Sequence, residues 1–161
     1  MSRANIFSAV STIARLVMAV VWISAGISKM GSLAVVKADI EAYQIFTAQW
    51  SSILAVLIGP LELVAGILLL VGFMQPQVAK VTNIVLVLFI IGIAQAWIRG
   101  LEIDCGCFGA GNSDPNRNFP LEYAWVIIRD IGFIALTTWL IYRPDHKFSV
   151  DRLLGGTGTR S

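Results

Sequence analysis

The sequence predicts an all-α integral membrane protein built as a bundle of four transmembrane helices. Hydrophobic residues make up 57% of its 161 residues and charged residues only 14%, whereas soluble domains average about 45–50% and 25%. A chain of this length cannot enclose so much apolar surface within a single core. It also contains four apolar segments of about 20 residues, the length that a helix needs to cross a bilayer.

The four predicted spans cover residues 6–28, 53–74, 78–98 and 123–142. Arg3 precedes the first apolar run, as in a signal peptide, but the run reaches Ile27 without a clear cleavage site, so we expect it to remain as a span. The polar, helix-breaking residues 75–77 predict a short turn and therefore an antiparallel hairpin. We assign residues 1–150 to one membrane domain and residues 151–161 to a flexible cytoplasmic tail.

Basic residues beside the spans predict how the chain is oriented, because they gather on the cytoplasmic side of a membrane. Orientation with both termini in the cytoplasm places more Lys and Arg residues inside than outside, and we therefore expect a multi-pass protein of the bacterial inner (plasma) membrane. The first outer loop, residues 29–52, mixes apolar and charged positions. This pattern predicts a short amphipathic helix on the membrane surface. The net charge of +2 is too small to indicate a nucleic-acid partner.

Cys105 and Cys107 are the only cysteines, and they flank Gly106 in the second outer loop. A disulfide persists on the outer side of the membrane. A bridge across so short a loop restrains the unfolded chain very little, and a strained, exposed bridge is easily reduced. Both arguments favour a redox-active disulfide over a structural one. A metal site is the third alternative, but zinc takes about four ligands, and the single histidine, His146, is expected on the opposite side.

Charged residues inside the predicted spans form a second candidate site. Each costs about 2.5–3.5 kcal/mol at the bilayer centre on insertion scales, so these side chains should pair within the bundle. At about 1.5 Å per residue from the outer ends, Arg15 lies about 20 Å deep, Glu62 about 14 Å and Arg129 about 10 Å. We predict an Arg15–Glu62 pair and an Arg129–Asp130 pair nearer the cysteines. The four residues either fix the helix register or form a polar site for a quinone head group or a proton path.

Lys29 ends a helix face on which Arg15 and Trp22 recur at intervals of seven residues. We expect Lys29 to lie close to the cysteine loop, where a positive charge would stabilise a thiolate. Three glycines of the spans predict close helix packing, since small residues let membrane helices approach one another; they are Gly26, Gly66 and Gly72.

Five short pieces between residues 15 and 130 recur together in one family. They are Arg15, Ala25-Gly26-Ile27-Ser28-Lys29, Pro60-Leu61-Glu62 with Gly66, Asp104-Cys105-Gly106-Cys107-Phe108-Gly109, and Arg129-Asp130. In this order they resemble the MauE branch of the MauE/DoxX family of redox-associated membrane proteins. The element around the two cysteines is the most specific of the five.

The resemblance implies a four-helix bundle similar to that of quinone-linked thiol oxidoreductases of the vitamin K epoxide reductase type. It also implies disulfide chemistry beside a thioredoxin-like or DsbA-like extracytoplasmic partner. The family takes its name from methylamine utilisation, in which it matures the disulfide-rich subunit of methylamine dehydrogenase. A self-sufficient thiol–quinone oxidoreductase commonly carries a second cysteine pair, which this chain lacks.

Two functions therefore remain open. In the first, the chain is a membrane thiol–disulfide redox component, in which Cys105 and Cys107 exchange electrons with the outer partner and a quinone accepts or supplies electrons near Glu62, Arg129, Asp130 and Arg15. In the second, it is a non-enzymatic subunit that anchors or assembles a larger redox or respiratory membrane complex, and the Cys105–Cys107 bridge is structural.

Overall fold

The computed structural model describes residues 3–103 and 118–143. Within these ranges all regular secondary structure is helical, in five segments: α1 Arg3–Met30, α2 Leu33–Ala42, α3 Ala48–Val71, α4 Gln75–Ile98 and α5 Phe119–Tyr142. Both cysteines and the predicted tail lie outside the described residues, and the single-domain prediction remains a prediction.

Four of the helices, α1, α3, α4 and α5, are long and apolar enough to cross a membrane. Each also carries large apolar side chains on its outward face, such as Val20, Leu61, Leu88 and Ile128, each more than 60% exposed. Apolar surface of this extent is rare on soluble monomers but is the normal lipid-facing surface of a membrane bundle. The prediction of a multi-pass membrane protein with four long helices is confirmed.

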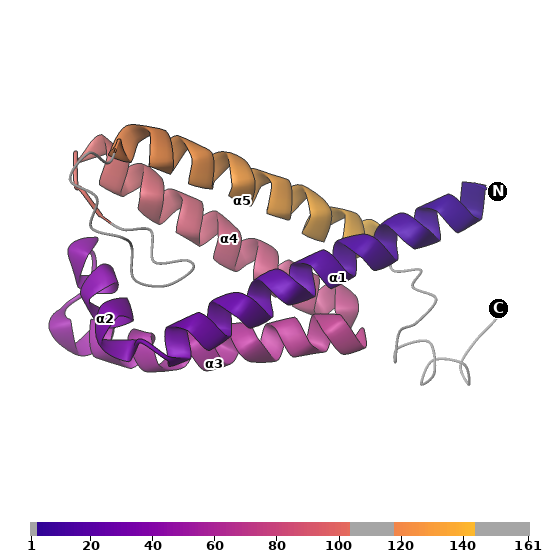
Figure 1. Ribbon diagram of the computed structural model, residues 1–161, viewed down its shortest axis with the longest axis horizontal. Coiled ribbons are helices and arrows are strands. Elements are labelled where there is room, and N and C mark those ends of the chain that lie inside the picture. Colours follow the sequence, from indigo (N-terminus) through magenta and orange to yellow (C-terminus); the bar gives the residue numbers. More distant parts are fainter. Residues whose placement is uncertain (1–2, 104–117, 144–161) are drawn as a thin grey trace.

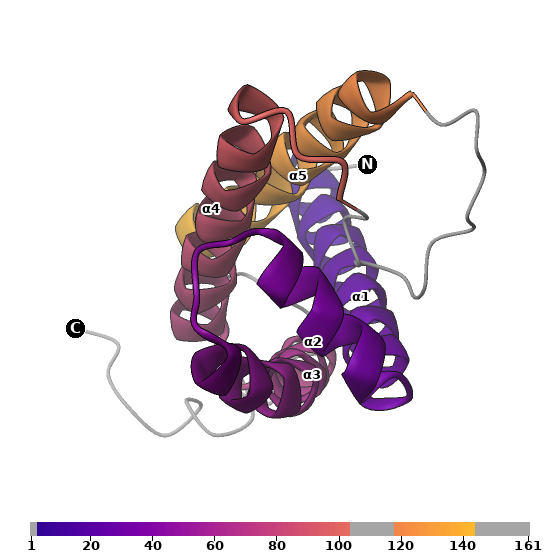
Figure 2. The same cartoon turned by 90° about the vertical axis from the view of Figure 1, so that its left-hand side faces the viewer.

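The four long helices form two antiparallel pairs. α1 packs along α3, and α4 packs along α5. The pairs meet near the start of α1 and spread apart toward the end where α2 lies (Figure 1). Viewed along the bundle, α2 crosses this wider end (Figure 2). The two pairs thus enclose a wedge whose wide end faces α2.

At the narrow end, the beginning of α1 contacts the end of α5. The Trp139 indole N–H donates to Ser11 Oγ (3.0 Å), and Ser11 Oγ donates to the carbonyl of Arg143 (3.3 Å). Nearby, an apolar cluster of Ala14, Ala79 and Leu140 joins α1, α4 and α5. The first and last described helix ends therefore lie on the same side, as an even number of spans requires. The predicted cytoplasmic placement of both termini remains a prediction.

The α1–α3 contact depends on glycine. A Cβ atom on Gly26 would lie 2.6 Å from the backbone nitrogen of Leu63, and one on Gly66 would lie 2.7 Å from the backbone nitrogen of Ile23. Such close backbone approach is possible only for small residues. The packing role predicted for Gly26 and Gly66 is confirmed.

The turn between α3 and α4 differs from the predicted one. Gly72 ends α3 with a left-handed backbone (φ 72°), and its N–H donates to the carbonyl of Leu68 (2.9 Å). Gln75 and Pro76 already belong to the first turn of α4. Proline is tolerated there because first-turn N–H groups have no intrahelical partner, whereas glycine is favoured just past a helix end. The break is therefore at residues 72–74, and Gly72 caps α3; its predicted packing role remains a prediction.

The short helix α2 lies within the loop for which a helix was predicted, and it packs against α3. The chain after α2 is joined to the end of α4, because Arg99 Nη2 donates to Gln44 Oε1 (2.8 Å). α2 is thereby tied to both helix pairs at the wide end of the wedge. Its predicted location on the membrane surface remains a prediction.

Candidate functional site

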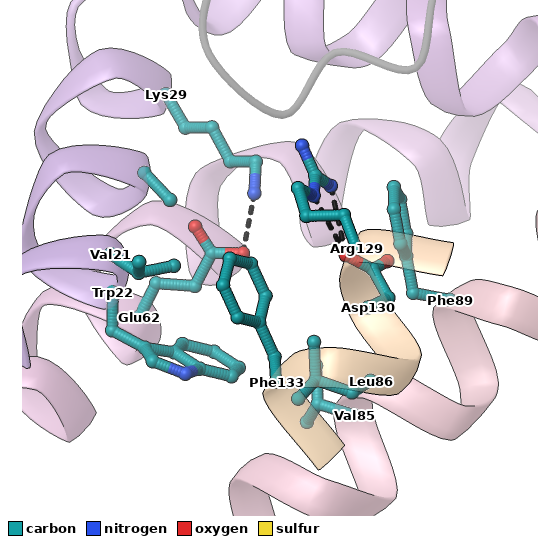
Figure 3. A pocket seen from close by; sticks show the side chains of 11 residues that line it. Val21, Trp22, Lys29, Glu62, Val85, Leu86, Phe89, Arg129, Asp130 and Phe133 are labelled. Carbon is teal, nitrogen blue, oxygen red and sulfur yellow. Dashed lines mark hydrogen bonds and ion pairs between the residues drawn. The ribbon is translucent and has the colours of Figure 1, made fainter. Parts of the chain in front are cut away.

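A cavity of about 80 Å³ lies between the two helix pairs and receives side chains from all four long helices. Its walls are mostly apolar, with the aromatic rings of Trp22, Phe89 and Phe133. Two ion pairs supply its polar groups: Lys29–Glu62 from α1 and α3, and Arg129–Asp130 from α5. Figure 3 shows the two pairs on opposite sides of the cavity, with the rings of Phe133 and Trp22 beside them.

Glu62 pairs with Lys29 and not with Arg15, so the predicted Arg15–Glu62 pair is wrong. Lys29 Nζ donates to Glu62 Oε1, and both side chains are largely buried, at 16% and 11% exposed. The depth estimate failed because it assumed that all helices begin at one level. Gly59 of α3 lies against Met30 at the end of α1, so the eleven residues of α3 before Gly59 extend about 16 Å beyond α1.

Arg15 lies deeper in the bundle and does not line the cavity. It is buried at 3% exposed, on the same face of α1 as Trp22 and Lys29 but about 21 Å along the helix from Lys29. The seven-residue repeat therefore predicts the shared face but not a shared site. Of the four residues predicted to bind a cofactor, the structure brings Glu62, Arg129 and Asp130 together and leaves Arg15 apart.

The Arg129–Asp130 pair is confirmed. Arg129 Nη2 and Nε lie 2.9 and 3.0 Å from Asp130 Oδ1, and Asp130 is 1% exposed. The guanidinium also lies 5.7 Å from the ring centre of Phe133, within cation–π range. Because both charges belong to α5, this pair does not join two helices.

Glu62 and Asp130 each use one carboxylate oxygen in an ion pair, and the other oxygen has no hydrogen-bond donor in the described residues. Within the described part of the chain, Glu62 Oε2 and Asp130 Oδ2 are buried and accept no hydrogen bond. A buried polar group without a partner typically costs about 1–3 kcal/mol. Beside the cavity, two carboxylate oxygens are therefore buried without the hydrogen-bond donors that would offset the loss of their hydration.

Tyr123 holds the chain that leads to the cysteines. Its hydroxyl donates to the carbonyl of Leu101 (2.6 Å) and accepts from the N–H of Ile103 (2.7 Å). The phenol is 3% exposed and has the rings of Trp97 and Phe119 beside it. From the sequence, Tyr123 is only an aromatic residue at the outer end of a span. Its position twenty residues beyond Ile103 does not reveal the contact.

Three of the residues predicted to bind a quinone line this cavity: Glu62, Arg129 and Asp130. Lys29 and Arg129 could donate to a quinone carbonyl, but the volume of about 80 Å³ is well below the roughly 150 Å³ of a cavity that binds benzene. The cavity as it stands is therefore too small to enclose a quinone ring completely. In the described residues, no three His, Cys, Asp or Glu side chains gather in a way that could hold a metal ion.

A family model described as "Methylamine utilisation protein MauE" matches residues 7–143, which include α1 from its fifth residue on, the other three long helices and the segment with both cysteines. Neither the search of curated proteins nor that of solved structures gave a significant match.

Proposed function

The chain belongs to the MauE family, and from that premise we propose that it is a membrane thiol–disulfide redox component. In this proposal Cys105 and Cys107 exchange electrons with a thioredoxin-like or DsbA-like protein outside the bacterial inner membrane. The family's printed name supplies the proposed context, methylamine utilisation.

The proposed exchange moves two electrons and leaves no sulfur unpaired. A thiolate of the partner attacks the Cys105–Cys107 disulfide, which forms a mixed disulfide and releases one cysteine as a thiolate. The partner's second thiolate then attacks the mixed disulfide, so that the partner becomes oxidised and Cys105 and Cys107 become a dithiol. The reverse sequence oxidises the dithiol and reduces the partner.

One observation carries the proposal: the only two cysteines directly follow a segment that the buried Tyr123 holds at two peptide groups. The anchor ends at Ile103, two residues before Cys105. A reactive pair that must meet a partner protein benefits from a fixed approach to a short loop. A purely structural bridge over three residues would contribute little stability by itself.

The predicted role of Lys29 in stabilising a cysteine thiolate remains part of the proposal. Its partner in the described structure is Glu62, so Lys29 would act on a thiolate as one half of an ion pair. A membrane quinone, if it is the electron acceptor, would supply two-electron chemistry. Because the cavity is smaller than a quinone ring, no step is assigned through a quinone within it.

Trapping the mixed disulfide tests the proposal. Cells that carry Cys105→Ser or Cys107→Ser should accumulate a covalent complex with an extracytoplasmic protein. The chain then lacks the second cysteine that would attack and resolve the mixed disulfide. The double Cys105→Ser/Cys107→Ser variant is the matched control and should trap nothing. In parallel, the reduction potential of the purified wild-type pair should lie in the range of exchangeable disulfides, above about −300 mV.

A potential far below that range, together with no trapped partner, would overturn the exchange function. It would favour the second candidate, a structural bridge in a subunit of a larger membrane complex. The proposed orientation has its own test. A membrane-impermeant thiol reagent should label Cys105 or Cys107 in intact, reduced spheroplasts, and failure to label would place the loop in the cytoplasm.

A further inference from the structure

The two ends of the bundle differ in charge. The acidic side chains of the described residues all lie at the cavity or on the α2 side of it; they are Asp39, Glu41, Glu62, Glu102, Glu122 and Asp130. The narrow end carries Lys80 and Arg143, and neither cation forms an ion pair within the described ranges. Because α1 and α4 begin at this end whereas α3 and α5 end there, the helix dipoles largely cancel. The side chains therefore make the narrow end positive.

An aromatic ring orients Arg143 at the narrow end. The first turns of α1 project beyond the end of α5 (Figure 1), and the guanidinium carbon of Arg143 lies 5.3 Å from the ring centre of Phe7 in α1. The Phe7 ring centre lies 6.0 Å from that of Trp139. Trp139 donates to Ser11, which donates to the carbonyl of Arg143. The backbone and the guanidinium of Arg143 are thus both held against α1, although the side chain is exposed.

The position of Arg143 indicates what it can bind. A guanidinium that lies over a ring keeps the N–H groups along its edge for another partner, and their planar arrangement matches two oxygens of one phosphate. Arg143 directly follows Tyr142, the last residue of a span, and Trp139 and Tyr142 are aromatic residues typical of the membrane–water interface. The guanidinium therefore lies at the level of the lipid head groups.

We propose that Arg143 and Phe7 form a binding site for the phosphate group of an anionic phospholipid. Lipid surrounds a membrane bundle, and the positive charge of the narrow end selects an anionic head group over a zwitterionic one. The acyl chains follow the neighbouring face of α1, where three apolar side chains are exposed: Val10, Ile13 and Val17. The proposal goes beyond thiol exchange and depends neither on it nor on the orientation of the chain in the membrane.

Native mass spectrometry of the full-length protein tests the proposal. The protein is released from nanodiscs that contain equal amounts of phosphatidylglycerol and phosphatidylcholine, and the lipids that remain bound are counted. The wild-type protein should retain more phosphatidylglycerol than phosphatidylcholine. Arg143→Ala should lower this preference about fivefold, the ratio expected for one basic residue at an anionic membrane surface. An unchanged ratio of the two lipids in Arg143→Ala would overturn the proposal.

Matched controls distinguish a specific site from general positive charge. Lys80→Ala removes an exposed cation from the same end of the bundle and should reduce the lipid preference much less than Arg143→Ala does. Phe7→Leu keeps every charge but removes the ring that orients Arg143, so it should also lower the preference. Phe73→Leu, which changes a partly exposed ring in the turn before α4, should not. Equal losses in Arg143→Ala and Lys80→Ala would refute the site.

Thermal unfolding in nanodiscs of a single lipid provides a second measurement. A ligand that binds the folded state stabilises it, so exchange of phosphatidylcholine for phosphatidylglycerol should raise the unfolding temperature of the wild type more than that of Arg143→Ala. An equal rise in both proteins would contradict the proposal. The Cys105→Ser/Cys107→Ser protein should keep the wild-type lipid preference, so failure of the lipid site and failure of thiol exchange are separate results.

Discussion

The two helix pairs hold together by different means. α1 and α3 meet through Gly26 and Gly66, where backbones touch, and the Lys29–Glu62 ion pair crosses this contact. α4 and α5 meet through side chains: Asn83 bonds Thr137 and donates to Thr138 Oγ1 (2.9 Å). Lipid offers no hydrophobic drive for association, so packing and hydrogen bonds must supply it. The α1–α3 pair uses close backbone packing and one hydrogen-bonded ion pair, whereas α4–α5 relies on hydroxyl and amide groups.

The two ion pairs differ in whether they connect two helices. Lys29–Glu62 joins α1 to α3 and is therefore part of the packing of that pair. Arg129–Asp130 lies within α5, so this ion pair does not itself cross a contact between helices. Loss of the first pair is therefore expected to weaken the α1–α3 contact, whereas loss of the second is not expected to weaken a contact between helices.

The largest expected effect is on the interhelical ion pair. Glu62→Gln leaves the buried Lys29 charge without its partner, and loss of one member of a buried pair costs about 3–5 kcal/mol. Equilibrium unfolding in mixed SDS micelles measures the loss. The double variant Lys29→Met/Glu62→Leu, with no charge left, should recover most of it. A double variant as unstable as Glu62→Gln would mean that the ion pair contributes more to stability than the mutual neutralisation of its two charges.

Glycine substitution probes the closest backbone contact. Gly26→Ala should force α1 away from α3 and cost about 1–3 kcal/mol, the usual range for overpacking. Gly132→Ala in α5 is the matched control, because its Cβ would meet nothing within 4 Å. The control should be neutral or more stable by up to about 1 kcal/mol, since alanine favours a helix over glycine. Equal unfolding free energies for the two variants would disprove the glycine contact.

The α4–α5 contact should be weaker per residue. Asn83→Ala should destabilise the bundle by roughly 1 kcal/mol, as hydrogen bonds between membrane helices usually do. A double-mutant cycle with Thr137→Val isolates the shared interaction. A coupling energy near zero would show that the Asn83 contacts follow from the packing and do not cause it.

The smallest effect on stability is expected at Tyr123. Tyr123→Phe removes the hydroxyl from Leu101 and Ile103 and should cost about 1 kcal/mol, the usual net contribution of a hydrogen bond. Reduced Cys105 and Cys107 should nevertheless react faster with a maleimide as their approach segment loosens. Phe119→Leu, which alters the same aromatic group without touching the hydrogen bonds, should leave the rate unchanged. An unchanged reaction rate in Tyr123→Phe would show that Tyr123 does not control the accessibility of the cysteines.

The sequence predicts the spans well because a membrane helix is recorded in composition over about 20 residues. It predicts the Arg129–Asp130 pair because the two residues are neighbours on one helix. It cannot predict the partner of Glu62, which depends on how far α3 slides along α1. That register is set by the contacts of Gly26 and Gly66 with the opposite backbone, and these glycines are visible in the sequence only as small residues.

The distance along the chain between Lys29 and Glu62, 33 residues, has a consequence for biogenesis. The ribosome adds about 5–20 residues per second, so a nascent α1 waits roughly 2–7 s for the carboxylate that neutralises its lysine. Through that interval Lys29, in the last turn of α1, can keep its ammonium group in the interfacial layer, as long basic side chains do near helix ends. Its transfer into the bundle then accompanies the arrival of α3, which makes the pairing of these two helices a step of membrane insertion as well as of folding.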